Sequence, residues 1–351
     1  MKGTRGCTAK GHFEAFIYGL SDSYILCSSS SDDSTRIWNI DTSECIGSFE
    51  ERIFPDSICT LSNGDTLILQ PEGGLKCWRP LCTQPKDSLQ PVILRYLSEE
   101  QACRSLCSLP NGCFAANSVD HVIRIWDSST GRCNFELDAY DATDSKMISV
   151  LNTSQLASIT GIGYTSIRVW NFRTGDCDWV LTGHSGAIQC ISALSPAGIL
   201  FASSSLDRTV RIWNVSTGRC DHVIHVGLPI VSLTALSRDR LLMQSEDQSS
   251  LLVYEKGIIT RVVDGSRGKI SCWCLRADGR IATASYSGRI EIWDIDSKEC
   301  LFKIKKWSHN EIGCIFSLAS GRLVIALNST NMIQIFDQPL PAVSPLHAHR
   351  P

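Results

Sequence analysis

A short segment, a branched aliphatic residue followed by an aromatic residue and then Asn or Asp, returns at regular intervals along this chain. The clear copies are Ile37-Trp38-Asn39, Ile125-Trp126-Asp127, Val169-Trp170-Asn171, Ile212-Trp213-Asn214 and Ile292-Trp293-Asp294, and the weaker ones are Cys77-Trp78, Val253-Tyr254-Glu255 and Ile335-Phe336-Asp337. Successive aromatic residues lie 39 to 48 positions apart. A period of this length over nearly the whole chain indicates one supersecondary unit that is copied many times.

The best copy, residues 184–220, has the composition of four short strands joined by turns. Apolar or alternating runs occupy 187–194, 199–204, 209–214 and 219–224, and Gly, Pro, Asp and Ser residues separate them. Helical periodicity is almost absent. Four short strands in each repeat are typical of one blade of an all-β propeller.

These repeats resemble the WD-repeat family, and the resemblance covers about residues 3–338. It implies a β-propeller of four-stranded blades, and the eight aromatic anchors then imply eight blades. The sixth repeat, around Tyr254, departs from the pattern, so a seven-bladed propeller with one irregular segment is the alternative.

In that family a His, a strand Ser or Thr, a turn Asp and the repeat Trp form a buried hydrogen-bonded tetrad. The matching residues in this chain are His12, Ser28, Asp32 and Trp38 in the first repeat, and His184, Ser203, Asp207 and Trp213 in the fifth. Buried His and Asp side chains are costly unless they are paired, and the tetrad pairs them. Because the set recurs at the repeat spacing, we interpret it as structural rather than as a hydrolase triad.

The two ends of the chain differ in character. Residues 3–10 resemble a fourth strand that lacks its first three partners, and an open edge strand is a liability. We therefore expect a single propeller domain over residues 1–338, in which residues 3–10 complete the last blade. Pro339, Pro341 and Pro345 disfavour a paired strand, so residues 339–351 are predicted to be a Pro-rich flexible tail.

Seventeen cysteines occur in the 351 residues, and many keep one place in the repeat. Those seven residues after the aromatic are Cys45, Cys133, Cys177, Cys220 and Cys300, and a second set, 20 or 21 residues after it, contains Cys59, Cys190, Cys274 and Cys314. A free cysteine behaves as a small buried hydrophobe. We therefore interpret both sets as core residues of a protein in the reducing cytoplasm, with the nucleus as the alternative location.

Composition and motifs disfavour most kinds of chemistry. The net charge of −3 gives no long-range attraction to nucleic acid, and no apolar stretch is long enough to span a bilayer. No phosphate-binding glycine loop is present, because Gly161-Ile-Gly163 lacks the third glycine, and Cys272-Trp-Cys274 lacks zinc-site spacing. We predict no cofactor, no metal and no enzymatic activity; an active site in a propeller channel is the alternative.

Protein or peptide binding is the predicted function, because rigid scaffolds carry variable loops. The turn before each third strand and the loop before each first strand form the contact face in the WD-repeat family. The predicted partner-binding residues are Phe54, Tyr140, Tyr164, Leu206, Tyr286, Trp307 and Arg173. Of these, Tyr140, Tyr286 and Trp307 are expected to share one recognition surface. We expect a monomeric propeller within a larger complex, without nucleic acid or membrane partners.

Two further interpretations concern particular segments. Trp170-Asn171-Phe172-Arg173 resembles the Trp-Asp-x-Arg motif of some substrate receptors of cullin-type ubiquitin ligases, although Asn171 replaces the acid. The segment Phe172-Arg173-Thr174-Gly175 also resembles a phosphoinositide-binding motif, Phe-Arg-Arg-Gly, but it has the pattern of an ordinary repeat turn. The insertion at residues 79–100 is either a second contact site or a tolerated surface extension.

Overall fold

The computed structural model describes the strands and most of the turns that join them. The described residues are 8–10, 16–21, 23–28, 34–49, 58–69, 75–78, 92–94, 103–118, 120–138, 148–194, 198–237, 239–264, 268–304, 312–327 and 332–336. They form two compact units, one comprising residues 1–32, 36–48 and 271–351 and the other residues 33–35 and 49–270. Each unit is built from four-stranded sheets.

Eight four-stranded sheets are present within the described residues, and their number matches a propeller with eight blades. Numbered in chain order, sheets 2 to 6 belong to the unit of residues 49–270, and sheets 1, 7 and 8 belong to the other unit. This count confirms the eight-bladed prediction. The seven-bladed alternative is wrong, because the sixth repeat forms a complete sheet despite its weak sequence pattern.

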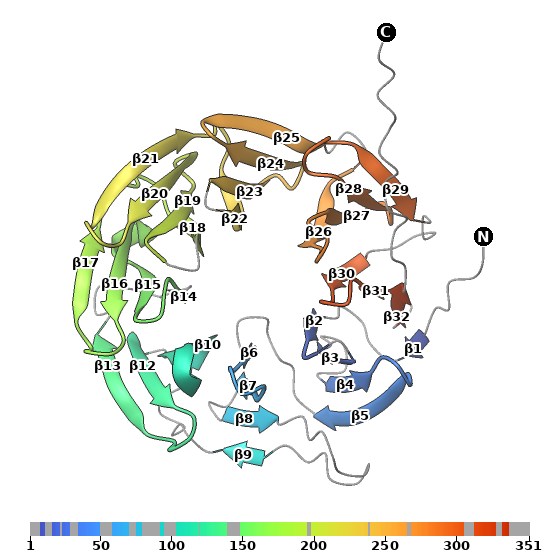
Figure 1. The fold of residues 1–351 in the computed structure, drawn as a ribbon, viewed down its shortest axis with the longest axis horizontal. Helices are drawn as coiled ribbons and strands as arrows, with labels where there is room; N and C mark the ends of the chain where they lie inside the picture. The colour runs from blue at the N-terminus through green and yellow to red at the C-terminus, as the bar shows by residue number, and fades with distance from the viewer. Residues whose placement is uncertain are drawn as a thin grey trace, which may run out of the picture. The chain divides into compact units, whose positions relative to one another are not determined.

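Sheets 2 to 6 each contain four strands that are consecutive in the chain. Their strands are β6 (Ile58–Thr60), β7 (Thr66–Leu69), β8 (Leu75–Trp78), β9 (Val92–Leu94), β10 (Cys103–Ser108), β11 (Cys113–Ser118), β12 (Val122–Asp127), β13 (Cys133–Asp138), β14 (Ile148–Val150), β15 (Gln155–Thr160), β16 (Ser166–Asn171), β17 (Cys177–Leu181), β18 (Ile188–Ala193), β19 (Leu200–Ser205), β20 (Thr209–Asn214), β21 (Arg219–His225), β22 (Ile230–Ser237), β23 (Arg240–Ser245), β24 (Ser250–Glu255) and β25 (Ile258–Asp264). Within this unit the first strand of each sheet lies innermost and the fourth outermost (Figure 1).

In the other unit, sheets 1 and 7 follow the same plan and sheet 8 combines both ends of the chain. Their strands are β2 (Phe16–Gly19), β3 (Tyr24–Ser28), β4 (Thr35–Asn39), β5 (Glu44–Phe49), β26 (Ile270–Leu275), β27 (Ile281–Ser285), β28 (Ile290–Trp293), β29 (Cys300–Ile304), β30 (Ile312–Ser317), β31 (Leu323–Leu327), β32 (Met332–Phe336) and β1 (Thr8–Lys10). Strand β1 pairs antiparallel with β32, with Ala9 opposite Ile333. The N-terminal segment therefore supplies the fourth strand of sheet 8.

The insertion at residues 79–100 contains a strand that the sequence pattern does not reveal. Strand β9 pairs antiparallel with β8, with Cys77 opposite Val92, and completes sheet 2. The rest of the insertion, and the predicted tail at residues 339–351, lie outside the described residues. Part of this segment is thus structural, which neither interpretation of the insertion included.

Burial along the strands follows their position in each sheet. All four residues of β7 and of β28 are buried, whereas four of the five residues of β17 are exposed. Burial therefore does not alternate along these inner strands, which carry mostly apolar residues. The core accordingly lies between sheets: Phe201 and Trp213 of sheet 5, for example, pack with Ile159 and Val169 of sheet 4.

A β-bulge marks the repeat aromatic in sheets 3, 4, 5 and 7. The register shifts at Trp126, Trp170, Trp213 and Trp293, which lie opposite Cys133, Cys177, Cys220 and Cys300. Each of these thiols, and that of Cys45, donates a hydrogen bond to the carbonyl two residues further on, at 3.3–3.5 Å. The recurring cysteine therefore belongs to the bulge.

The prediction that these cysteines fill the core is wrong for Cys45 and Cys177, which are exposed because the fourth strand is the outermost of its sheet. Cys133 and Cys220 are half-buried and pack against core clusters, and Cys300 is also half-buried.

On the first strands, Cys59 and Cys190 are buried, whereas Cys274 and Cys314 are half-buried. Burial raises the pKa of the Cys190 thiol, and it raises the pKa of Cys107 to about 11. Such thiols stay protonated and unreactive at neutral pH.

Candidate functional site

The fifth repeat places its predicted tetrad in one chain of hydrogen bonds. His184 precedes β18, Ser203 lies on β19, Asp207 lies in the turn after β19, and Trp213 lies on β20. Trp213 Nε1 donates to Ser203 Oγ at 2.8 Å, Ser203 Oγ lies 2.8 Å from His184 Nε2, and His184 Nδ1 lies 2.8 Å from Asp207 Oδ2. The four residues thus connect two strands, the turn between them and the loop that precedes β18.

The donors and acceptors of this chain match when His184 is neutral. Its Nδ1–H donates to the carboxylate of Asp207, and its Nε2 accepts from the hydroxyl of Ser203, whose oxygen accepts the indole N–H. Burial lowers the pKa of His184, which favours this neutral form. Each of these side-chain donors and acceptors of the tetrad then has a hydrogen-bond partner.

Asp207 is held in its charged form by the same turn. Burial raises its pKa, but hydrogen bonds from Thr209, His184 and the Ser185 amide outweigh burial and lower the pKa to about 2. The Ser203 side chain is fully buried, at 0% exposure, and its hydroxyl is engaged by two partners. A nucleophile needs access to a substrate, so this geometry cannot work as a hydrolase triad.

The first-repeat tetrad can be followed only in part. Trp38 is buried, at 8% exposure, on β4. His12 and Asp32 lie outside the described residues, and only the backbone of Ser28, on β3, is described. The geometry of this tetrad therefore stays a prediction.

Sheet 3 uses an arginine where sheet 5 uses a histidine. The buried guanidinium of Arg124 donates to both carboxylate oxygens of Asp120, at 2.6 and 3.1 Å. It also bonds Glu136 at 2.9 Å and Ser118 Oγ at 3.1 Å. A planar guanidinium suits such a bidentate contact, so the turn acid of this repeat keeps a partner without a histidine.

In sheets 4 and 7 the described residues show the indole hydrogen bond of the tetrad. Trp170 Nε1 donates to Ser158 Oγ at 2.9 Å, and Trp293 Nε1 donates to Thr283 Oγ1 at 3.1 Å. Tyr164 occupies the turn-acid position of sheet 4; its side chain is half-buried and packs against the core between sheets 4 and 5. As a predicted partner-binding residue, Tyr164 therefore has a packing role as well.

Two large apolar side chains are exposed on the turns before the third strands of sheets 4 and 5. Leu206, a predicted contact residue, is 40% exposed, and Ile162 is 93% exposed. The predicted contact residues did not include Ile162, because from this turn they included its aromatic residue, Tyr164. Both lie in the unit of residues 49–270.

In the other unit the corresponding turn of sheet 7 carries Tyr286, which is 52% exposed. The remaining predicted aromatic contacts, Phe54, Tyr140 and Trp307, lie outside the described residues. The proposed recognition surface of Tyr140, Tyr286 and Trp307 therefore stays a prediction.

Arg173 lies in the turn between β16 and β17 and is exposed. Its Nε donates to the carbonyl of Thr153 at 3.2 Å, and its amide donates to Asn171 Oδ1 at 3.0 Å. Asp127, Asn214 and Asp294 accept amide hydrogen bonds in the same way in their own turns. The segment from Trp170 to Arg173 thus has the geometry of the ordinary repeat turn.

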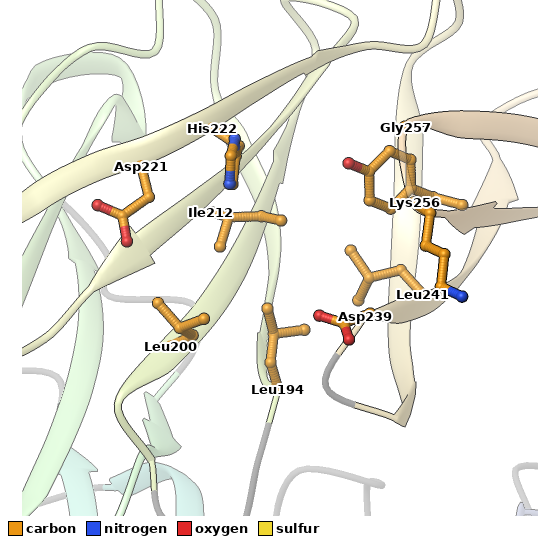
Figure 2. Close-up of a pocket in the computed structure, with 10 residues that line it drawn as sticks. Leu194, Leu200, Ile212, Asp221, His222, Asp239, Leu241, Lys256 and Gly257 are labelled. Carbon is orange, nitrogen blue, oxygen red and sulfur yellow. The ribbon is translucent and has the colours of Figure 1, made fainter.

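A groove of about 650 Å³ lies between sheets 5 and 6, away from the turns just described. Its floor is apolar, with Leu194, Leu200, Ile212 and Leu241, and Asp221, His222, Asp239 and Lys256 line its rim (Figure 2). These residues come from the opposite ends of the strands from Leu206. No sequence signal reveals the groove, because its walls belong to two different repeats.

Within the described residues, no group of three or more His, Cys, Asp or Glu side chains is arranged to hold a metal ion. The same residues contain no helix long and apolar enough to cross a membrane.

A family model described as "WD domain, G-beta repeat" matches residues 3–39, 93–127, 175–214 and 257–294. Each matched segment ends on the Asn or Asp that follows a repeat tryptophan: Asn39, Asp127, Asn214 and Asp294. Four WD repeats are present in this chain. The tetrad, the bulged tryptophan and the four-stranded sheets are therefore features of WD repeats in this chain.

Three curated proteins resemble this WD-repeat chain. Apoptotic protease-activating factor 1 of Danio rerio is 26% identical over 308 residues, which are 83% of this chain and 24% of that protein. Mitochondrial division protein 1 of Eremothecium gossypii is 26% identical, over 47% of this chain and 26% of that protein. The transcriptional corepressor LEUNIG_HOMOLOG of Arabidopsis thaliana is 30% identical, over 30% of this chain and 13% of that protein. The chain thus spans about a quarter or less of the length of these relatives.

Two solved propellers share the fold. The computationally designed Ika8 protein has a TM-score of 0.73 at 16% identity and covers 95% of this WD-repeat chain and 99% of its own. The WD40 β-propeller domain of Doa1 has a TM-score of 0.56 at 15% identity, with 96% and 98% covered. At such low identity these likenesses show the fold alone.

Proposed function

We propose that this WD-repeat propeller is a non-catalytic scaffold that binds other proteins through the turns before the third strands of its sheets. The observation that supports the proposal is the exposure of large apolar side chains there: Ile162 at 93%, Leu206 at 40% and Tyr286 at 52%. Turns are usually built from Gly, Pro, Asn, Asp and Ser. Exposed apolar and aromatic side chains in such positions are typical anchors of protein interfaces.

The presence of WD repeats supports the same conclusion at a coarser level. WD-repeat propellers typically serve as protein-interaction scaffolds, and relatives named as a protease-activating factor and a corepressor fit an adaptor role. The competing class, an enzyme with its active site in the channel, gains no support from the His184 tetrad, because its nucleophile candidate Ser203 is fully buried. We propose a monomeric propeller that works within a larger complex.

The test compares the partners that co-purify with tagged wild-type and variant chains, measured by quantitative mass spectrometry. One variant combines Ile162→Ala with Leu206→Ala, and a second carries Tyr286→Ala. Val223→Ala, at 41% exposure on the outermost strand β21, matches Leu206 in exposure and serves as the control.

We expect at least one partner to be lost by a turn variant and retained by the Val223→Ala control. If both turn variants fold as the wild type and keep every partner, these turns are not the binding surface and the proposal fails.

We also propose that the protein works in the reducing cytoplasm. The supporting observation is that five cysteine thiols act as hydrogen-bond donors in the bulges, a role that requires the reduced form. Fluorescence imaging of a tagged chain tests the location. A secreted or lumenal protein would contradict it.

A further inference from the structure

Aromatic side chains fill the space between neighbouring sheets at two places on the outer surface of the unit of residues 49–270. Phe135 of β13 lies on Gly175 of sheet 4, and Trp179 of β17 lies on Gly218 of sheet 5. A Cβ atom built on Gly175 would lie 2.9 Å from the Phe135 ring, and one on Gly218 would lie 2.3 Å from the indole of Trp179. The ring of one sheet therefore rests directly on the turn of the next.

The two rings occupy one repeat position. Each lies two residues after the bulge cysteine and pairs with the residue before the repeat tryptophan, Ile125 or Val169. Trp179 is further fixed by its indole N–H, which donates to the carbonyl of Val215 at 2.7 Å. We call this position, with its ring on the next turn, the aromatic wedge.

Between sheets 5 and 6 the wedge position carries His222. It follows Cys220 by two residues and pairs with Ile212, so its place in the sheet is the same. The turn of sheet 6 that would contact a ring at this position is also shorter than the matching turn of sheet 5. Asn214 pairs with Arg219 across a turn of residues 215–218 in sheet 5, whereas Glu255 pairs with Ile258 across Lys256 and Gly257 alone in sheet 6.

Both changes leave space at this junction. A Cβ atom built on Gly257 meets nothing within 4 Å, in contrast to Gly175 and Gly218. Figure 2 shows His222 and Ile212 on one wall of the groove, and Gly257 and Leu241 on the facing wall. The groove of about 650 Å³ therefore lies where the wedge position carries His222 in place of Phe or Trp, and Tyr254 of β24 forms part of its wall. Its volume lies in the range of about 300–1,000 Å³ that is typical of ligand sites.

The walls of the groove define what can fill it. The floor of Leu194, Leu200, Ile212 and Leu241 suits an aromatic ring, which is the group that fills the two neighbouring junctions. Asp221 and Asp239 place exposed carboxylates on the two sheets that face each other across the groove, and these two acidic groups outnumber the one lysine of the rim, Lys256. Cationic residues on either side of an inserted ring would meet these carboxylates.

We propose that the groove between sheets 5 and 6 binds a segment of a partner protein that inserts one aromatic side chain, Trp or Phe, flanked by Arg or Lys. The partner's ring takes the place that Phe135 and Trp179 occupy at the two preceding junctions. This inference rests on the scaffold function proposed above and adds a second binding site, separate from the turns that carry Leu206.

The test uses three synthetic peptides and the full chain. The probe, acetyl-Arg-Gly-Trp-Gly-Arg-amide with a 5-fluoro-tryptophan, is titrated by ¹⁹F NMR. Acetyl-Arg-Gly-Ala-Gly-Arg-amide competes with it, and a fluorinated acetyl-Glu-Gly-Trp-Gly-Glu-amide is titrated in the same way. We expect the Ala peptide to bind at least about tenfold more weakly than the probe, because it buries no ring. The Glu peptide should also bind more weakly, and high salt should narrow that difference.

Two substitutions locate the binding. His222→Trp supplies the missing ring from within and should weaken probe binding at least about tenfold. Val223→Trp adds the same bulk to the next residue of β21, which does not line the groove, and should leave binding unchanged. Asp239→Lys should reverse the preference between the Arg and Glu peptides. This variant tests the groove as the binding site if His222→Trp fails to fold, and an unchanged preference would then contradict the proposal.

Equal binding of the Trp and Ala peptides, or probe binding that survives His222→Trp in a folded chain, would overturn the proposal. Failure here is distinguishable from failure of the scaffold function. If the chain keeps partners that depend on Leu206 or Tyr286 but does not bind the probe, only the groove proposal falls.

Discussion

At the scale of single residues, hydrogen-bond partners show that residue types typical of an active site have a structural role in this chain. His184, Ser203 and Asp207 have the residue types of a hydrolase, yet each is bonded to the next and Ser203 is fully buried. Leaving one buried partner unpaired typically costs about 1–3 kcal/mol. The tetrad therefore stabilises the fold, and Arg124 provides a comparable set of bonds to Asp120 in sheet 3.

The protonation of His184 makes stability depend on pH. Burial lowers its pKa below the ordinary value of 6.5, so the unfolded chain takes up a proton that the folded chain resists. The free energy of unfolding should then fall as the pH drops below about 6.5, by at most about 1.4 kcal/mol per pH unit. Asp207, with its pKa lowered to about 2 from 3.8, contributes stability above about pH 3.8 that is lost only at lower pH.

Urea unfolding of wild type and His184→Gln between pH 7.5 and 5 measures this effect. The variant should be less stable at pH 7.5 and should show a shallower decline. The same substitution at the exposed His225 is the control. Parallel declines in wild type and His184→Gln would contradict the assignment of the slope to His184.

At the scale of elements, the sheets are locked to one another by side chains that reach across their junctions. Strand boundaries in the fifth repeat follow the sequence pattern closely, since the predicted 209–214 is strand β20 and 219–224 lies within β21. The aromatic wedge was not predicted, because Trp179 and Gly218 are in different repeats and nothing in the spacing connects them. The exposure of Cys45 and Cys177 was predicted wrongly for a similar reason, as it depends on which strand is outermost.

Two glycines allow the wedge contact to be measured by itself. Gly218 and Gly257 both have positive φ, +66° and +87°, so alanine at either position is strained by about 1–2 kcal/mol. At Gly218 the added methyl also collides with Trp179, whereas at Gly257 it meets nothing. We expect Gly218→Ala to lower the free energy of unfolding by about 1–3 kcal/mol more than Gly257→Ala does.

Chemical unfolding of the two single variants checks this prediction. Gly218→Ala is also measured in a Trp179→Ala background, in which the indole is absent. In that background the penalty at Gly218 should shrink to that at Gly257. Equal penalties for the two single variants would mean that the wedge contributes little to stability.

At the scale of the whole molecule, the two ends of the chain together complete the last sheet. Sheet 8 needs a fourth strand, and β1 supplies it by pairing with β32. Without β1, the outer edge of β32 would present unpaired amide and carbonyl groups, which favour association between chains.

Removing residues 1–10 should therefore lower the midpoint of thermal unfolding and increase association, measured by calorimetry and light scattering. Removing residues 340–351, which lie outside the described residues, is the control and should change neither. If the N-terminal deletion unfolds at the wild-type temperature and stays monomeric, β1 is dispensable.

The repeat spacing by itself predicted WD-like repeats and a propeller of four-stranded sheets, because each repeat specifies its own strands and turns through local residue patterns. The choice of eight sheets over seven was made by the structure, in which the sixth repeat forms a complete sheet. The weak copy at Tyr254 still forms a complete sheet, and the first four residues of its third strand β24 are buried. What only the tertiary structure decided is which junctions between sheets are filled. The wedge at Trp179 and the groove beside His222 arise between residues about 40 positions apart, and packing across that distance is set by the assembled sheets rather than by any local pattern.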